Sequence, residues 1–288
     1  MPEASAFALL LSPGVLGLLG LMVGSFLNVV IHRLPLMLER GWKLDSAELL
    51  GIDPAGLKEM PEALTLAAPR SRCPSCGAAI AWYENVPLLG WLRLKGRCSN
   101  CGARIPARYP LVEAATALLF AAVGWRFGAQ PVVLVWCAVA ATLLALAAID
   151  WDTTLLPDGL TLPLLWAGLV AGALGWTLPL AEAVWGAVAG YLSLWSVYWM
   201  FKLATGKEGM GHGDFKLLAA IGAWLGWQMV LPVVLGASVL GAVVGIVMKT
   251  LGSLREGRYV PFGPFHAIAA VVVLLAGAPR VLGWLGWA

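Results

Sequence analysis

Residues 143–166 read LLALAAIDWDTTLLPDGLTLPLLW, in which an apolar run gives way to a short acidic segment and then resumes. The two apolar runs cover roughly residues 132–149 and 159–176. An α-helix needs about 20 mainly apolar residues to cross the hydrocarbon core of a bilayer. Carboxylates are costly near hydrocarbon, so those found there are candidates for function. The stretch predicts two membrane helices joined by a loop that carries Asp150, Asp152 and Asp158.

The composition of the whole chain supports this interpretation. Its 288 residues are 60% hydrophobic and 12% charged, whereas soluble domains are about a quarter charged. The apolar runs are continuous rather than alternating, which argues against a β-barrel. We therefore expect an all-α polytopic membrane protein with about eight transmembrane helices. The expected spans are roughly residues 9–31, 110–128, 131–149, 159–176, 181–202, 214–227, 229–249 and 265–284.

The chain divides into three expected regions. Residues 1–32 form a retained first helix, because MPEASAFALLL lacks the positive segment of a cleavable signal peptide. Residues 33–108 form a polar, zinc-ribbon-like loop domain, and residues 109–288 form the main membrane domain. The net charge of +3 gives no reason to expect a nucleic-acid partner.

The distribution of Lys and Arg predicts the orientation in the membrane. If residues 33–108 face the cytoplasm, 17 of the 19 Lys and Arg residues lie on that side. Only Arg126 and Arg280 fall opposite. Positive residues favour the cytoplasmic side, so we expect both termini outside and the loops that carry Asp150 and Asp214 inside.

Four of the five cysteines form two pairs with the spacing Cys73-x2-Cys76-x21-Cys98-x2-Cys101. A glycine follows each pair, and four thiolates suit a closed tetrahedral zinc site, which is usually structural. A reducing cytoplasm favours a metal over disulfides, although a disulfide or redox pair remains open. The fifth cysteine, Cys137, lies within an expected span and is expected to be a packing residue.

Asp214 lies in GMGHGDFKLLAAIGAWLGW, residues 209–227, where a glycine-rich loop meets an apolar helix. It is expected on the same face of the membrane as Asp150. Two carboxylates that meet in a low-dielectric cleft share one proton, and such a pair can hydrolyse an amide with one member as base and the other as acid.

Simpler roles for the acids remain open at this point. Asp214 could cap its helix, Asp150 could be solvated, and Asp158 suits an N-cap position. Asp152 lies further into the loop, and the roles of Glu113 and His212 are undecided. His32 and His266 flank membrane ends and are expected at the interface.

Several segments together resemble the bacterial prepilin peptidases, also called type IV leader peptidases. They are GLMVGSFLNVVIHRLP (20–35), the paired cysteines, AAIDWDTTLLPDGLTLPLLW (147–166), GYLSLWSVYWMFKLATGKEGMGHGDFKLLAAIGAWLGW (190–227) and PFGPFHAIAA (261–270). The resemblance covers nearly the whole chain, and the segments occur in the family's order.

The resemblance implies an inner-membrane aspartic peptidase in which Asp150 and Asp214 are catalytic. It implies cleavage of the basic leader of type IV prepilins or type II secretion pseudopilins after a glycine. It also implies N-methylation of the new N-terminus with S-adenosylmethionine, for which no binding residues can be assigned. From the acids alone, an ion-coupled transporter or a non-catalytic assembly scaffold remains the alternative.

Overall fold

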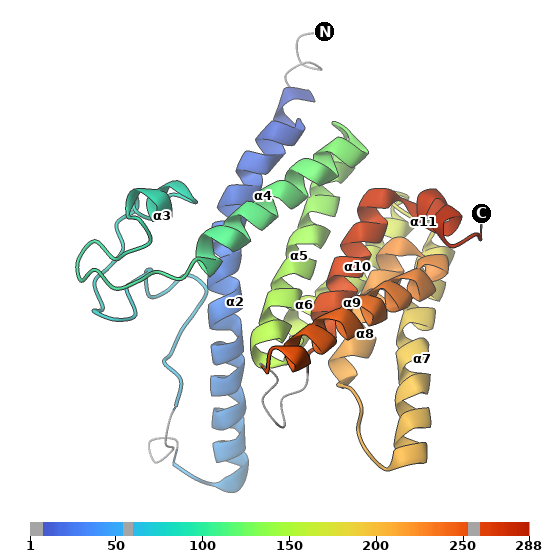
Figure 1. The fold of residues 1–288 in the computed structure, drawn as a ribbon. Helices are drawn as coiled ribbons and strands as arrows, with labels where there is room; N and C mark the ends of the chain where they lie inside the picture. Colours follow the sequence, from blue (N-terminus) through green and yellow to red (C-terminus); the bar gives the residue numbers. More distant parts are fainter. Residues whose placement is uncertain (1–7, 54–59, 253–259, 288) are drawn as a thin grey trace. The chain divides into compact units, whose positions relative to one another are not determined.

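The computed structural model describes residues 8–53, 60–252 and 260–287 (Figure 1). Lys58, Arg255 and Arg258, which count in the charge argument, lie outside these residues. Within them the chain is helical, and the β-structure is confined to two isolated bridges near the cysteines. The chain divides into two compact units, residues 1–137 and 138–288, which are described separately.

The first unit is built on two helices, α2 (Pro13–Leu50) and α4 (Arg108–Phe127), with the short helix α3 (Leu89–Arg93) in the lobe between them. Helices α2 and α4 pack closely because glycines line the contact. A Cβ placed on Gly20 or Gly24 would lie 2.7 Å from a Cα atom of α4. Small residues allow this close approach, which drives helix association in membranes through van der Waals packing.

Helix α2 continues well past the predicted end of the first span at residue 31. Its 38 residues correspond to about 57 Å at 1.5 Å per residue, whereas the hydrocarbon core is about 30 Å thick. Neither the polar residues after Ile31 nor Pro35 ends the helix. The polar half of α2 therefore projects beyond the membrane as a rigid support.

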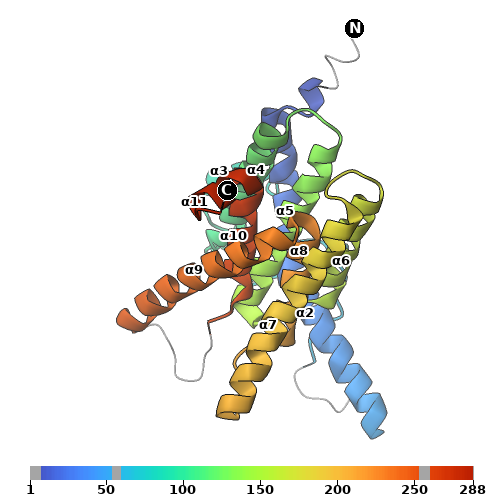
Figure 2. The same cartoon turned by 90° about the vertical axis from the view of Figure 1, so that its right-hand side faces the viewer.

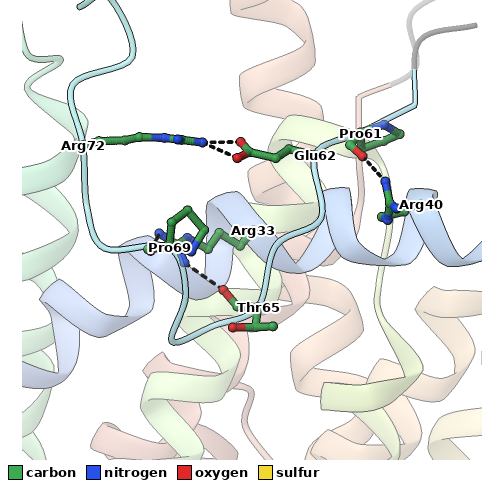
Figure 3. A network of polar contacts seen from close by, with 7 residues as sticks. All are labelled: Arg33, Arg40, Pro61, Glu62, Thr65, Pro69 and Arg72. Carbon is green, nitrogen blue, oxygen red and sulfur yellow. Dashed lines mark hydrogen bonds and ion pairs between the residues drawn. The ribbon is translucent and has the colours of Figure 1, made fainter. Parts of the chain in front are cut away.

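Two arginines on this polar half hold the loop that leads to the cysteines (Figure 3). Arg33 donates to the carbonyl oxygens of Thr65 and Pro69, each over 2.7 Å. Arg40 donates to the carbonyl of Pro61 over 2.7 Å. Because the acceptors belong to the backbone, this attachment depends on the arginines rather than on the loop's side chains.

The second unit is a helical bundle around α8 (Figure 2). Its other elements are α5 (Val132–Thr153), which begins in the first unit, α6 (Asp158–Ala173), α7 (Leu180–Thr205), η2 (Trp227–Met229), α9 (Val230–Thr250), α10 (Gly263–Ala276) and α11 (Ala278–Trp284). Helix α8 (His212–Leu225) packs against α6, α7 and α10, and ten of its 14 residues are buried.

The contact between α7 and α8 is a backbone-to-backbone contact. A Cβ placed on Gly186 would lie 2.0 Å from the carbonyl oxygen of Gly222, and one on Gly222 would lie 2.1 Å from that of Gly186. Further along the same helix pair, Gly190 approaches the carbonyl of Leu218 in the same way. These glycines bring α7 against the helix that carries Asp214.

The predicted helices are present, but the count of eight spans is not confirmed. Among the described residues, five helical segments are long and apolar enough to cross a membrane. A sixth would be the pair α10 and α11, which is bent by 108°. Helices α6 and α8 have only 16 and 14 residues. Because its neighbours surround α8, its length need not match the bilayer thickness. The chain is a multi-pass membrane protein.

Candidate active site and metal centre

Asp150 lies in the last turn of α5 with only 5% of its surface exposed. Its Oδ2 atom accepts a hydrogen bond of 3.0 Å from the backbone N–H of Gly263, the first residue of α10. The preceding residue, Ile149, is completely buried. The structure therefore excludes the solvated alternative for Asp150.

Gly263 is close enough to Asp150 to exclude any side chain. A Cβ placed on Gly263 would lie 2.5 Å from Asp150 Oδ2, which is well inside van der Waals contact. Leu156, in the loop after α5, packs on both sides of the site. Its side chain would lie 3.3 Å from a Cβ atom on Gly263 and 2.9 Å from a Cβ atom on Gly213. Leu156 thus links the Gly263 turn to the residue that precedes Asp214.

Asp214 lies in the first turn of α8 and is 8% exposed. Its side chain does not cap the helix, whose N-cap residue is Gly211. Its Oδ1 atom is buried and has no hydrogen-bond partner among the described residues. Leu156 lies against both Gly213, which precedes Asp214, and Gly263, which binds Asp150, so the two carboxylates lie around one side chain. The structure therefore brings together two buried carboxylates that are 64 positions apart in the chain.

His266 lies in the first turn of α10 and faces the protein interior. It is completely buried one turn after Gly263, and neither ring nitrogen has a hydrogen-bond partner among the described residues. The Phe262 ring packs against it edge-on, with a centroid separation of 4.6 Å. The sequence alone did not reveal Gly263 and His266 as neighbours of the site; the only signal was the PFGPFHAIAA segment as a family motif.

The remaining acids near the pair have assigned positions. Asp158 is the first residue of α6 rather than its N-cap, and its side chain does not cap the helix. Both its oxygens instead accept from Lys216 Nζ at 2.8 Å, which ties α6 to α8. Asp152 lies exposed in the last turn of α5.

The loop before α8 is held by a second ion pair. Lys202 Nζ donates to Glu208 Oε1 over 2.9 Å, and this hydrogen bond lowers the pKa of Glu208. Tyr198 contacts the same carboxylate over 3.3 Å. His212 is exposed, and its ring packs against the rings of Tyr198 and Phe215, with centroid separations of 5.2 and 5.3 Å. These contacts fix the glycine-rich segment that precedes Asp214.

The four paired cysteines converge in the first unit. Their Sγ atoms all lie within 4.8 Å of one another, and the Sγ atoms of Cys73 and Cys101 are 3.8 Å apart. Four sulfurs at about 2.3 Å from a tetrahedral zinc ion would be about 3.8 Å apart, so the residues present fit this metal. All five cysteines lie within the described residues, and none forms a disulfide. The cluster could bind zinc.

The two cysteine pairs have the same local geometry. The N–H of Gly77 donates to the Cys73 carbonyl, and that of Gly102 donates to the Cys98 carbonyl, each over 2.9 Å. Both glycines have positive φ, 72° and 71°, which glycine adopts without steric cost. The backbone N–H of Ala78 and the side chain of Asn100 lower the pKa of the Cys76 thiol to about 6, whereas contacts with the other three thiols raise the pKa of Cys101 to about 11. A lowered thiol pKa favours the thiolate that binds metal.

Glu113 forms no ion pair among the described residues and binds a backbone N–H instead. It is 8% exposed, and its Oε2 atom accepts the backbone N–H of Leu88 over 2.8 Å. Leu88 has a positive φ of 58° and immediately precedes α3. Glu113 thus attaches the cysteine-bearing lobe to the membrane helix α4.

The comparisons with known proteins agree with these features. Residues 18–127 match the Bacterial Peptidase A24 N-terminal domain, and residues 137–246 match the Type IV leader peptidase family. The prepilin leader peptidase/N-methyltransferase of Stutzerimonas stutzeri is 51% identical, over 94% of this chain and 92% of the relative. The enzyme of the same name from Pseudomonas aeruginosa is 52% identical, over 90% of this chain and 89% of the relative.

A third relative, the prepilin leader peptidase/N-methyltransferase of Aeromonas hydrophila, is 54% identical over 90% of this chain and 89% of the relative. No solved structure matches the chain. The identity to each of these relatives extends over nearly the full length of both chains. The chain therefore belongs to the type IV leader peptidase family, as its motifs predicted.

Proposed function

We propose that this chain cleaves the basic leader of type IV prepilins or type II secretion pseudopilins after a glycine. It then N-methylates the new N-terminal residue. Relatives that share half of its residues are named prepilin leader peptidase/N-methyltransferase. The observation that carries the proposal is the pair of buried carboxylates, Asp150 and Asp214, at the ends of two membrane-embedded helices.

The pair suits peptide hydrolysis because two close carboxylates in a low-dielectric site share one proton. The ionised member takes a proton from a water molecule as that water attacks the scissile carbonyl. The protonated member donates its proton to the carbonyl oxygen. As the tetrahedral intermediate collapses, the member that took the water proton donates it to the leaving amine, and the first donor recovers a proton from a hydroxyl of the intermediate. Oδ1 of Asp214, which has no hydrogen-bond partner among the described residues, can accept a hydrogen bond from the water or the substrate.

Gly263 acts as a positioning residue in this scheme. Its N–H occupies Oδ2 of Asp150 and fixes the orientation of that carboxylate. Glycines 209, 211 and 213 allow the backbone near Asp214 to approach an extended peptide. Both effects hold the reacting groups in position. In well-oriented systems such positioning lowers the activation free energy by about 7 kcal/mol or more.

The proposed orientation places both termini in the periplasm and residues 33–108 in the cytoplasm of a bacterial inner membrane. The support is the excess of Lys and Arg in these loops. A prepilin has a basic leader followed by an apolar helix, so its scissile bond would lie at the inner interface. Of the acids that could meet the leader's positive charge, Asp158 and Glu208 are already paired with lysines.

The two cofactors would act separately. Zinc held by Cys73, Cys76, Cys98 and Cys101 would have four sulfur ligands and no open position, so its role is structural. S-adenosylmethionine would supply the methyl group for the new N-terminal amine. No residue of this chain is assigned to its binding. An ion-coupled transporter and a non-catalytic scaffold would both lack the peptide cleavage that the relatives' names state.

The test is an assay of the detergent-purified chain with a full-length prepilin and S-adenosylmethionine, analysed by mass spectrometry. We expect release of the leader after a glycine, followed by addition of one methyl group to the new N-terminus. Leader release without added methyl donor would show that the two steps are separable. An intact prepilin after prolonged incubation with folded, metal-loaded protein would overturn the proposal.

A further inference from the structure

The lobe between α2 and α4 exposes apolar side chains around the short helix α3. Leu89 is 65% exposed, Leu92 is 61% exposed and Trp82 is 75% exposed. Apolar side chains gathered on an exposed surface mark a site of contact with a membrane or another protein. The position of α3 along the membrane helices is the observation that distinguishes a membrane from a protein partner.

One hydrogen bond attaches the lobe to the helix α4, and a second joins α4 to α2. Leu88, immediately before α3, donates its backbone N–H to Glu113 on the second turn of α4. Glu113 in turn packs against α2. A Cβ atom placed on Gly24 of α2 would lie only 2.7 Å from the Cα atom of Glu113. Asn28 donates its side-chain amide to the carbonyl of Tyr109 over 3.1 Å, which fixes the register of the two helices.

The depth follows from the register of α2. Gly24 precedes Arg33, the first Lys or Arg in α2, by nine residues, which is about 13 Å along the helix. Residues 13–31 contain no Asp, Glu, Lys or Arg and form the apolar half of α2. The start of α3 is therefore held beside this apolar half. Figure 1 shows α3 at the height of the N-terminal half of α2.

The charges around α3 match the edge of a bilayer. Arg93, Lys95 and Arg97 follow the apolar residues directly, whereas Glu84 is the single acid between residues 82 and 97. The Arg93 guanidinium lies over the Tyr83 ring, 5.7 Å from its centroid. Aromatic and basic residues together are typical of the membrane interface, and basic residues near the surface are attracted to anionic lipids.

We propose that residues 82–92 form an interfacial wedge that inserts into the leaflet next to the metal-binding lobe. Leu89 and Leu92 contact lipid acyl chains, and Arg93 and Lys95 contact the phosphates of anionic phospholipids. The lobe then has three attachments: the arginines on the polar half of α2, Glu113 on the membrane helix α4, and the wedge in the lipid. The wedge keeps the four-thiolate centre at a fixed height above the bilayer, independently of peptide cleavage.

The experiment measures the environment of single positions in the intact chain. A nitroxide amino acid is introduced at position 89, 92 or 99 by stop-codon suppression, so that all five cysteines remain. The chains are reconstituted in vesicles of zwitterionic phosphatidylcholine with one-quarter anionic phosphatidylglycerol. Electron paramagnetic resonance then gives the accessibility of each label to oxygen, which concentrates in lipid, and to the anionic complex chromium oxalate, which stays in water.

We expect the ratio of oxygen to chromium oxalate accessibility to be at least fivefold higher at positions 89 and 92 than at Ser99. Ser99 is the matched control because it is exposed at the tip of the second cysteine pair. Equal ratios at all three positions would overturn the wedge. Protection of 89 and 92 from both reagents would also overturn it, because protein rather than lipid would then cover these residues.

A second set of vesicles without phosphatidylglycerol tests the charge argument. We expect the ratio at position 92 to fall at least twofold, because Arg93 and Lys95 lose their anionic partners. The Arg93→Gln, Lys95→Gln double variant in anionic vesicles should show the same fall. An unchanged ratio in both cases would overturn the assignment to anionic lipid.

Discussion

Gly263 donates its backbone N–H to the carboxylate of Asp150 over 3.0 Å, although 113 positions separate the two residues. The contact joins the end of α5 to the start of α10 and leaves no room for a Cβ atom. The candidate active site of this chain thus has three parts, the two aspartates and the turn that holds one of them.

This contact predicts that Gly263→Ala is far more harmful than an alanine substitution normally is. The new Cβ would lie 2.5 Å from Asp150 Oδ2 and must displace that carboxylate. We expect kcat for leader cleavage to fall at least tenfold, or about 1.4 kcal/mol, with KM changed less. Gly245→Ala is the matched control because nothing lies within 4 Å of its Cβ position. Equal activity of both variants would show that Gly263 does not position Asp150.

The contact between Gly186 and Gly222 predicts a stability effect. An alanine at position 222 would place its Cβ 2.1 Å from the backbone of α7, and overpacking of this kind costs about 3 kcal/mol. Gly222→Ala should therefore lower the Tm of the detergent-solubilised chain by several degrees. Gly159→Ala, with nothing within 4 Å of its Cβ position, should leave the Tm unchanged. Two equal Tm values would contradict the close packing of α7 on α8.

The four-cysteine centre predicts about one zinc per chain. Cys98→Ser should remove the metal, measured by mass spectrometry of the purified protein, and should destabilise the lobe, since metal binding contributes to folding. Cys137→Ala is the control because Cys137 lies within α5, outside the cluster. A metal-free wild-type chain with the four cysteines joined in disulfides would refute the site.

The arginine network of Figure 3 predicts that the loop before Cys73 depends on α2. Arg33→Met removes both hydrogen bonds, to Thr65 and Pro69, while keeping an unbranched side chain. We expect proteolysis between residues 61 and 72 to become several-fold faster. Lys95→Met, a charge-removing control in the same lobe, should not change the rate of cleavage there. Unchanged proteolysis of the Arg33 variant would mean that other contacts hold the loop.

Much of the helical fold could be predicted from apolar run length, because burial in lipid requires continuous apolar helices. The count of spans could not, because α8 has only 14 residues, of which residues 217–225 are apolar throughout. Hydropathy does not distinguish a helix buried by neighbours from one that crosses lipid. The end of α2 was also missed. Its polar half contains an ion pair between Glu39 and Lys43, four residues apart, and the side chains of Arg33 and Arg40 bind the backbone of the following loop.

The site was partly predictable for a similar reason. Asp150 and Asp214 stand out because carboxylates beside apolar helices are costly, and the cysteines stand out through their spacing. Gly263 carries no such signal, because its role depends on a backbone N–H that every non-proline residue has. The burial of His266 in the first turn of α10 was not predicted, because hydropathy does not show which face of a helix packs against its neighbours. Asp158 was expected to cap α6 but pairs with Lys216, a contact between helices that local sequence does not show.

The most direct measurement is the rate of leader cleavage by purified Asp150→Asn and Asp214→Asn variants, each with its Tm determined in the same detergent. Asparagine keeps the size of the side chain but cannot share the proton, so each rate should fall by about 10² or more while the Tm stays close to that of the wild type. Asp152→Asn and Asp158→Asn should lose much less activity. Cleavage at the wild-type rate by either the Asp150 or the Asp214 variant would contradict the aspartate pair.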